Sequence, residues 1–316
     1  MEKIYDMIVV GGGPGGYTAA LYAARAGLNV AVLEKLSAGG QMALTDQVDN
    51  YPGFVEGVDG FLLAENMEAQ AQRFGAETIL AEVEALELDG NIKKLVTSEG
   101  EFLARTLVIA TGANPRKLDL PREDALVGRG VHYCAACDGM RYRGKTVVVV
   151  GGGNSAAADA MVLSRIAKKV IVIHRRAALR ATKVYHDPLM QSENVEFIWN
   201  SAVKELLHHD NLTGLRVENL LTGEVQELGC DGLFVSIGRA PATALVEGKL
   251  QLENGYILAD ESTQTSVPGV FAVGDVRTKQ VRQIVTAVAD GAVAAHYAEE
   301  YLAKFCEKVT ESVAIM

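Results

Sequence analysis

A strand, a glycine-rich turn, a helix and a second strand follow one another twice in this sequence of 316 residues, and this repeat limits the possible folds most strongly. The first copy consists of the apolar run 6–10, the glycine turn 11–16, an alanine-rich helical stretch over 17–26 and the apolar run 29–33, which ends at Glu34. Units of this kind build parallel sheets with helices on their faces, so the repeat predicts an α/β fold.

Three positions of the first turn have a physical reason to be glycine if the unit binds a dinucleotide. Gly11 permits the tight turn, Gly13 lets the backbone approach a pyrophosphate, and Gly16 allows the helix to pack closely on the strand. The phosphates then meet the positive end of the helix. Glu34 is placed to accept hydrogen bonds from ribose hydroxyls, so the whole dinucleotide fingerprint occurs in its expected context.

The second copy aligns with the first without a gap. It comprises a strand over 146–150, the turn 151–156, a helix through 166 and a strand over 170–173. Gly151 precedes His174 by as many positions as Gly11 precedes Glu34. The turn keeps the Gly-x-Gly-x-x-Ala pattern, so we expect a second dinucleotide here.

The two copies differ in the residues at their ends. The first copy ends in an acidic residue, whereas basic residues follow the last strand of the second copy. Arg175 and Arg176 come directly after His174, and Arg180 is a few residues further on. A carboxylate favours a free 2′-hydroxyl, whereas guanidinium groups bind a phosphate with charge-assisted, often bidentate hydrogen bonds. The cluster therefore favours NADPH over NADH. The alternative is that these arginines belong to a solvated helix start.

Two matching apolar strands, 106–112 and 232–238, indicate how the copies are joined. Each ends in glycine and is followed by a proline, Pro115 or Pro241. The strand 270–275 has no counterpart in the second copy and most simply completes the first. We therefore predict two Rossmann-like, three-layer α/β domains, with residues 116–241 inserted into a domain formed by residues 1–115 and 242–316.

The pair Cys134 and Cys137 lies just ahead of the second glycine turn. Two cysteines at this spacing form a redox-active disulfide or half of a zinc site. A zinc site needs a second pair, and Cys230 and Cys306 are isolated in the sequence. We therefore expect a redox pair and no metal, with Cys230 and Cys306 as inert thiols.

Composition excludes several classes of protein. The formal net charge of -10 argues against bulk nucleic-acid binding, and no run of 18 or more apolar residues predicts a membrane span. Charged residues near the start lead directly into a strand, so we expect no targeting peptide. With only 4 cysteines in the chain, a reducing compartment is favoured, and cytoplasm is the expected location.

Over nearly the whole chain, the ordered motifs resemble the low-molecular-weight thioredoxin reductases of the bacterial type. The resemblance implies that the first domain binds FAD and the inserted domain binds NADPH. The motifs are the turn 11–16, Gly39-Gly40-Gln41, Asn50-Tyr51-Pro52-Gly53, Ala110-Thr111-Gly112, Cys134 to Asp138, the turn 151–156, His174-Arg175-Arg176, and Gly274-Asp275 followed by Arg282-Gln283.

The same resemblance implies the residues of both cofactor sites. Those for FAD are Gly11, Gly13, Pro14, Gly15, Gly16, Glu34, Lys35, Gly39, Gly40, Gln41, Asn50, Ala110, Thr111, Gly112, Gly274, Asp275, Arg282, Gln283 and Ile284. Those for NADPH are Gly151, Gly153, Asn154, Ser155, Ala156, His174, Arg175, Arg176 and Arg180. A helix from about 282 to 305 would begin under the flavin.

The implied activity is thioredoxin-disulfide reduction by a homodimer, in which electrons pass from NADPH through FAD and the cysteine pair to thioredoxin or a thioredoxin-like protein. Cys137 is the flavin-side sulfur, and Cys134 attacks the partner disulfide. Asp138 is the expected acid for a leaving thiolate; alternatively it is a helix N-cap. His132 is either a proton shuttle or an ordinary surface histidine. The disulfide and the flavin belong to different domains, so the domains are expected to rotate between half-reactions.

The sequence departs from the family pattern at Met140-Arg141-Tyr142, where paired aromatic residues often help to dock thioredoxin, and at Arg239, where a histidine is frequent. Rival interpretations are a ferredoxin-dependent reductase, a flavoprotein dithiol oxidase and a non-enzymatic NADPH-sensing flavoprotein. The intact second turn and its arginines disfavour the first two, and the cysteine pair disfavours the third.

Overall fold

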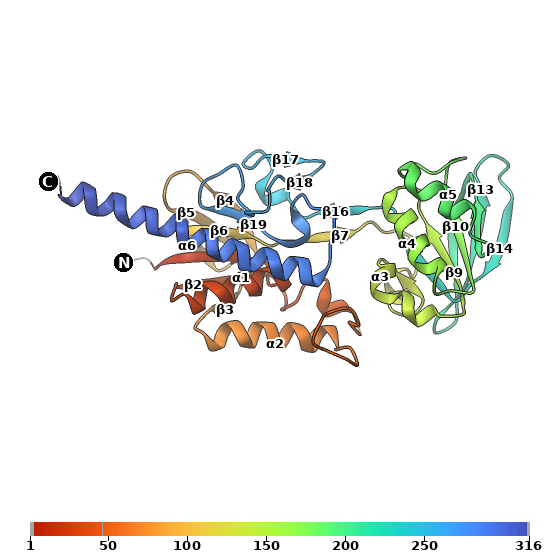
Figure 1. Cartoon of the computed structure of the whole chain (residues 1–316), viewed down its shortest axis with the longest axis horizontal. Helices are drawn as coiled ribbons and strands as arrows, with labels where there is room; N and C mark the ends of the chain where they lie inside the picture. Colours follow the sequence, from red (N-terminus) through yellow and green to blue (C-terminus); the bar gives the residue numbers. More distant parts are fainter. Residues whose placement is uncertain (1–2, 46, 315–316) are drawn as a thin grey trace. The chain divides into compact units, whose positions relative to one another are not determined.

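The chain folds into two compact units, which are drawn in Figure 1. Unit 1 comprises Met1–Asn114 and Pro241–Met316, and unit 2 comprises Pro115–Ala240. The structure, a computed structural model, describes the backbone over residues 3–45 and 47–314 and the side chains as far as Lys304. Cys306, expected to be inert, therefore lies outside the described side chains.

The main sheet of unit 1 is parallel on one side and antiparallel on the other. β6 takes part in both halves because its start pairs with β5 and its end pairs with β1 and β19. Alternate residues of β1 face opposite sides, so Met7 and Val9 enter one core cluster while Ile8 and Val10 enter the other. In spatial order the strands are β3 (Glu77–Leu80), β2 (Val30–Glu34), β1 (Ile4–Val10), β6 (Gly100–Ile109), β5 (Lys93–Thr97) and β4 (Val83–Glu87), with β19 (Val270–Ala272) also paired to β6.

Three helices surround this sheet: α1 (Pro14–Arg25), α2 (Gly60–Arg73) and α6 (Ile284–Ala314). α1 and α6 pack on each other through small residues (Figure 1). A Cβ atom at Gly291 of α6 would overlap the carbonyl oxygen of Gly15 in α1, and one at Gly15 would lie 3.0 Å from the carbonyl oxygen of Ala287. The two backbones therefore meet at a distance that only glycine permits.

Unit 2 has three layers. A parallel sheet lies in the middle, with the order β11 (Val195–Ile198), β10 (Lys169–Ile173), β9 (Thr146–Val150), β15 (Gly232–Val235) and β8 (Val131–His132). One face carries α3 (Ala135–Asp138), α4 (Asn154–Ser164) and α5 (His186–Met190). The other face carries an antiparallel sheet of β12 (Ser201–His208), β13 (Leu212–Asn219) and β14 (Val225–Gly229).

The chain passes between the units through β7 (Ala113–Pro115) and β16 (Arg239–Pro241), which pair with each other. The predicted α/β class is confirmed, and so is the placement of the strand near 270, because β19 pairs in parallel with β6. The expected strand 232–238 ends earlier, at Val235, and the chain resumes extended structure only at Arg239. A short hairpin of β17 (Leu252–Glu253) and β18 (Tyr256–Ile257) completes unit 1.

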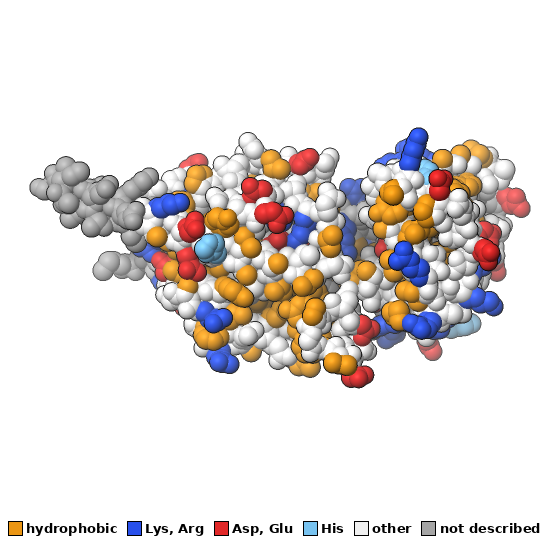
Figure 2. All heavy atoms as spheres, viewed as in Figure 1, with side chains coloured by type: hydrophobic (Ala, Val, Ile, Leu, Met, Phe, Trp, Pro, Cys, Tyr) orange, Lys and Arg blue, Asp and Glu red, His pale blue; other side chains and the backbone are white. Residues whose placement is uncertain are grey.

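Acidic and basic side chains are interspersed over the face shown in Figure 2. Hydrophobic side chains gather on unit 1 in the region where Figure 1 places α2. Exposed hydrophobic residues in this part of the chain are Leu44 of the 3₁₀ turn Met42–Leu44 and Phe61 and Leu62 at the start of α2. Among the described helices, none combines the length and the apolar character needed to cross a bilayer.

We expect the variant Gly291→Val to separate α6 from α1 and to lower the free energy of unfolding by about 1–3 kcal/mol, the usual result of overpacking a core. Glu299→Val is the matched control, because it places the same residue on an exposed position of the same helix and should change stability by less than about 0.5 kcal/mol. Urea denaturation of both variants measures the difference. Equal losses would contradict the close-contact explanation.

Candidate active site

The first glycine turn leaves the start of α1 open. Gly11 has a φ of 105°, a conformation that favours glycine, and its N–H donates to the carbonyl oxygen of Leu33 at 2.9 Å. A Cβ atom at Gly16 would overlap the carbonyl oxygen of Gly11. Gly13 caps α1 without any side-chain hydrogen bond, and no described atom lies within 4 Å of where its Cβ would be. Free N–H groups therefore face open space, as a pyrophosphate requires.

Glu34, at the end of β2, is anchored to this turn. Its Oε2 accepts from the N–H of Gly12 at 2.5 Å, and its Oε1 accepts from the N–H of Lys35 at 2.8 Å. The N–H of Gly39 donates to the carbonyl oxygen of Gly12 at 2.7 Å, which brings the loop after β2 onto the turn. The side chain of Lys35 instead pairs with Glu82. The carboxylate is therefore held in place for a hydroxyl donor, with lone pairs still available.

Asp290 of α6 holds the segment that carries Asp275. Its Oδ2 accepts from the N–H of Gly274 at 2.8 Å and from Lys279 Nζ at 2.7 Å, and its Oδ1 lies 3.3 Å from Arg277 Nη1. Asp290 and the two cations are largely removed from solvent. The sequence alone did not indicate Asp290, because an acidic residue on a long helix ordinarily faces solvent.

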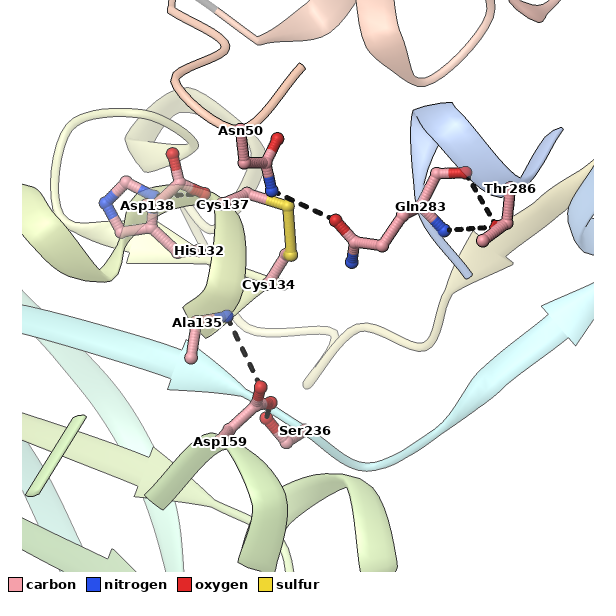
Figure 3. Close-up of a disulfide and its surroundings, with 10 residues drawn as sticks. All are labelled: Asn50, His132, Cys134, Ala135, Cys137, Asp138, Asp159, Ser236, Gln283 and Thr286. Atoms are coloured by element: carbon pink, nitrogen blue, oxygen red, sulfur yellow. Dashed lines mark hydrogen bonds and ion pairs between the residues drawn. A yellow bond between two sulfur atoms is a disulfide. The ribbon is translucent and has the colours of Figure 1, made fainter. Parts of the chain in front are cut away.

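A second group of expected FAD residues lies near the start of α6. Asn50 Nδ2 donates to Gln283 Oε1 at 3.0 Å, and Figure 3 shows this pair beside Thr286. The guanidinium of Arg282 lies over the ring of Tyr256, 4.2 Å from its centroid. Its Nε–H is buried and no described protein atom accepts from it, so the site offers a hydrogen-bond donor to a bound group. The helix itself begins at Ile284 and extends to Ala314.

The remaining expected residues of unit 1 lie around these two groups. Ala110 contacts the first turn, since a Cβ at Gly11 would lie 2.6 Å from the Ala110 carbonyl oxygen. Gln41 Nε2 donates to Asn114 Oδ1 at 3.0 Å, and Thr111 Oγ1 donates to the carbonyl oxygen of Ala242 at 2.7 Å. Pro14 and Gly15 lie in the first turn of α1. Gly40 and Gly112 leave space where side chains would be.

The glycine turn of unit 2 has the same geometry. Gly151 has a φ of 148°, and a Cβ there would overlap the carbonyl oxygen of Ser236 and press on Ala156. Gly153 caps α4 without a side-chain hydrogen bond, and no described atom would contact its Cβ. Asn154 Oδ1 accepts from the N–H of Thr182 at 2.8 Å, while Ser155 lies in the first turn of α4 and is exposed.

His174 takes the place in unit 2 that Glu34 takes in unit 1. Its ring packs flat against the turn, so a Cβ at Gly152 would overlap the imidazole. Burial lowers the pKa of His174, and the charges of Arg176, Arg175 and Arg180 lower it further. The arginines are exposed, and the buried Nε2 of His174 has no partner among the described protein atoms. An anionic group fits this arrangement.

Cys134 and Cys137 form a disulfide across the single turn of α3, with their Cα atoms 5.3 Å apart. Asp159 of α4 lies behind this turn: its Oδ1 accepts from the N–H of Ala135 at 3.4 Å, and its Oδ2 accepts from the hydroxyl of Ser236 (Figure 3). Burial raises the pKa of Asp159, and the two hydrogen bonds and the charge of Arg239 partly oppose this. The redox turn is therefore attached to the helix of the nucleotide turn.

Asp138 ends α3 beside His132, and the two side chains face each other in Figure 3. The alternative of a helix N-cap is wrong, because the Asp138 side chain makes no capping hydrogen bond to the 3₁₀ turn Gly139–Tyr142 that follows. His132 is buried, so the alternative of a surface histidine is also wrong. Of Met140, Arg141 and Tyr142, where paired aromatic residues often dock thioredoxin, Met140 is exposed whereas Tyr142 is buried and cannot belong to a partner surface.

Cys230 is buried, and burial raises its pKa to about 12, so this thiol is unreactive, as expected. Cys306 lies outside the described side chains. Within the described residues, no group of three or more His, Cys, Asp or Glu side chains is arranged to hold a metal ion.

Comparisons with known proteins agree with this geometry. Residues 5–291 match the family model for pyridine nucleotide-disulphide oxidoreductases. The chain is 45% identical to a thioredoxin reductase of Streptomyces clavuligerus over 97% of each chain, and 41% identical to that of Treponema pallidum over 96% of this chain and 98% of the other. It is also similar to the crystal structure of a thioredoxin reductase from Streptococcus pyogenes, with a TM-score of 0.90 and 42% identity over 96% of this chain and 100% of that chain. The chain belongs to the pyridine nucleotide-disulphide oxidoreductases, and within them to the thioredoxin reductase family.

Proposed function

We propose that this protein is an NADPH-dependent thioredoxin-disulfide reductase that uses FAD and the Cys134–Cys137 disulfide. The observation that carries the proposal is the attachment of this disulfide, through Asp159, to the helix of a nucleotide turn whose ribose position, at His174, is followed by three exposed arginines. The nucleotide site and the redox disulfide would supply the electron donor and the electron acceptor of such a reaction, with bound FAD between them.

Unit 1 is the proposed FAD domain. Support comes from the open start of α1 at Gly13, the anchored carboxylate of Glu34 and the unpartnered Nε–H of Arg282. Asp275, which the structure places on a segment held by Asp290, is the proposed ligand of the ribityl chain. Bound FAD would accept a hydride equivalent from reduced nicotinamide and return two electrons to the disulfide.

Unit 2 is the proposed NADPH domain. The exposed guanidinium groups of Arg175, Arg176 and Arg180 supply positive charge for a 2′-phosphate. His174 is held neutral by its lowered pKa, so it contributes a flat wall and a buried nitrogen rather than a charge. This cluster argues against a ferredoxin-dependent reductase or a dithiol oxidase, neither of which needs a phosphate-binding ribose site. A nucleotide sensor would have no use for the disulfide.

The protein substrate is proposed to react at Cys134. Its sulfur bonds to one sulfur of the thioredoxin disulfide, and the thiolate that departs takes a proton from Asp138. Cys137 then closes the enzyme disulfide and releases the second partner thiol. Met140, with about half of its surface exposed (51%), is the apolar side chain next to the redox turn that is available to such a partner.

A rotation of unit 2 on its two connections is proposed to alternate the half-reactions. The chain crosses between the units only at β7 and β16 within the described residues, and these two strands pair into one narrow ribbon. A rigid cross-link between the units should stop steady-state turnover while leaving each bound cofactor in place. Undiminished turnover of the cross-linked enzyme would rule the rotation out.

The assembly is proposed to be a homodimer that works in the cytoplasm. The exposed apolar residues Leu44, Phe61 and Leu62 on unit 1 support a protein interface, and symmetric dimers are the commonest assemblies. Light scattering of the purified protein distinguishes a dimer from a monomer.

We expect Cys134→Ser to lose at least about a hundredfold in kcat for thioredoxin, because a hydroxyl cannot form the mixed disulfide. Anaerobic NADPH should still bleach the flavin of this variant, since that step does not need Cys134. Cys230→Ser is the control and should keep full activity, because its thiol is buried and protonated. Thioredoxin turnover by the Cys134 variant at the wild-type rate would refute the proposal.

We expect the double variant Arg175→Ala, Arg176→Ala to raise the KM for NADPH by about tenfold to a hundredfold, because the two exposed arginines together are expected to contribute about as much as one charged hydrogen bond, roughly 1.5–3 kcal/mol. The KM for NADH should change little, because NADH has no 2′-phosphate. Arg165→Ala, an exposed arginine at the end of α4, is the matched control. Steady-state kinetics with both nucleotides measures the difference, and equal effects on NADPH and NADH would contradict the assignment.

A further inference from the structure

Three polar side chains form a chain of contacts beside the redox turn. His132 Nδ1 lies 3.2 Å from Asp138 Oδ2, and His132 Nε2 lies 2.7 Å from the hydroxyl of Tyr142. His132 ends β8, Asp138 ends α3, and Tyr142 belongs to the 3₁₀ turn that follows α3. Both ring nitrogens of the histidine are thus engaged.

The surroundings hold the His132 ring in one orientation. Only 3% of its surface is exposed. The ring stacks on Phe234 of β15 with centroids 5.3 Å apart, and Tyr142 contacts both rings edge-on, at 5.2 Å from His132 and 5.5 Å from Phe234. β8 and β15 pair in register at this point, with His132 opposite Phe234. The imidazole therefore cannot turn away from Asp138 without disrupting the core.

The hydrogen-bond contacts also select one tautomer of the His132 imidazole. Burial raises the pKa of Tyr142 to about 12, and the charge of Asp138 contributes, so the phenol keeps its proton near neutral pH. The Tyr142 hydroxyl then donates to Nε2, which leaves the proton of the neutral imidazole on Nδ1. Nδ1–H donates in turn to Oδ2 of ionised Asp138.

We infer that His132 is a positioning residue for proton transfer by Asp138: its Nδ1–H holds Oδ2, which leaves the other carboxylate oxygen for the redox sulfurs, and Tyr142 fixes the tautomer. The inference rests on the role proposed above for Asp138. It goes beyond that role because it assigns the orientation of the acid to His132, which the sequence left open as a proton shuttle or a surface histidine and which the structure buries.

The proton and electron balance of the exchange shows where this orientation matters. The reduced site begins with a Cys134 thiolate, a Cys137 thiol and protonated Asp138. As the Cys134 sulfur bonds to the partner and the partner disulfide breaks, the leaving thiolate takes the Asp138 proton. Asp138 next removes the Cys137 proton while Cys137 bonds to the Cys134 sulfur, and it passes that proton to the second leaving thiolate. The enzyme dithiol is oxidised and the partner disulfide is reduced.

The test compares two His132 variants that separate packing from hydrogen bonding. His132→Phe keeps an aromatic ring against Phe234 but has no donor, whereas His132→Asn loses the ring but places an amide donor near the position of Nδ1. Holoenzymes reduced by NADPH are mixed with oxidised thioredoxin and, separately, with dithiobis(nitrobenzoate). The latter releases an acidic aromatic thiol that leaves without a proton, so the rate measured with it, that of the first thiolate released, should not depend on Asp138.

We expect His132→Phe to slow thioredoxin reduction by about tenfold to a hundredfold, a part of the roughly 10²- to 10⁴-fold that general acid catalysis contributes. His132→Asn should recover most of that loss, and KM for thioredoxin, the rate of flavin reduction and the rate with the aromatic disulfide should change little in either variant. A wild-type rate in His132→Phe, or equal losses with both disulfides, would overturn the inference.

Asp138→Asn separates this inference from the role on which it rests. Suppose that Asp138→Asn slows the reduction of thioredoxin selectively and His132→Phe does not. This result overturns the role of His132 alone. No loss in Asp138→Asn overturns the role of Asp138 and the inference with it. If both hold, adding His132→Phe to Asp138→Asn should cost nothing further, because residues that act as one unit are not additive.

Discussion

Contacts between backbone atoms at glycine positions hold unit 1 together. The helix α1 reaches the end of β1 because Gly16 has no side chain to keep it from the carbonyl oxygen of Gly11, and α6 reaches α1 because Gly291 has none to keep it from Gly15. The same turn that leaves N–H groups free for a pyrophosphate is therefore also the point where the two helices are fixed. A side chain added here would disturb the core and the ligand site together, so stability and binding cannot be changed independently at these positions.

Unit 2 uses polar side chains where unit 1 uses close backbone contacts. Asp159 connects α4 to the turn that carries the disulfide, and its second oxygen is occupied by Ser236 at the end of the central sheet. The carboxyl is buried with a raised pKa, so it is expensive to hold ionised and is stabilised mainly by these two donors. On the other side of the turn, His132 meets Asp138. The redox turn is thus held between two acidic residues, both of them intermediate in exposure.

Local patterns predicted the parts of the structure that local forces determine. Spacing of apolar residues and glycines placed both βαβ units, and the φ angles of Gly11 and Gly151 confirm the tight turns. Long-range pairing was harder to predict. Asp159 lies in an alanine-rich stretch and looks like an ordinary helix residue until Ser236 is brought to it, and His132 becomes buried only because β8 pairs with β15. Residue types alone do not show which polar groups the sheet order will enclose.

The paired strands β7 and β16 bring the two ends of unit 2 together, and the N–H of Arg116 donates to the carbonyl oxygen of Gly238 at 3.0 Å. For unit 1, an inserted segment whose two ends are neighbours is a closed loop. The entropic cost of closing that loop depends little on the length of the segment, because it grows only slowly with chain length. Inserting unit 2 therefore costs unit 1 little more closure entropy than inserting a short hairpin would. Such a segment can be lengthened, shortened or exchanged in evolution while the first fold remains intact, which gives a physical reason for one redox scaffold to acquire different inserted units.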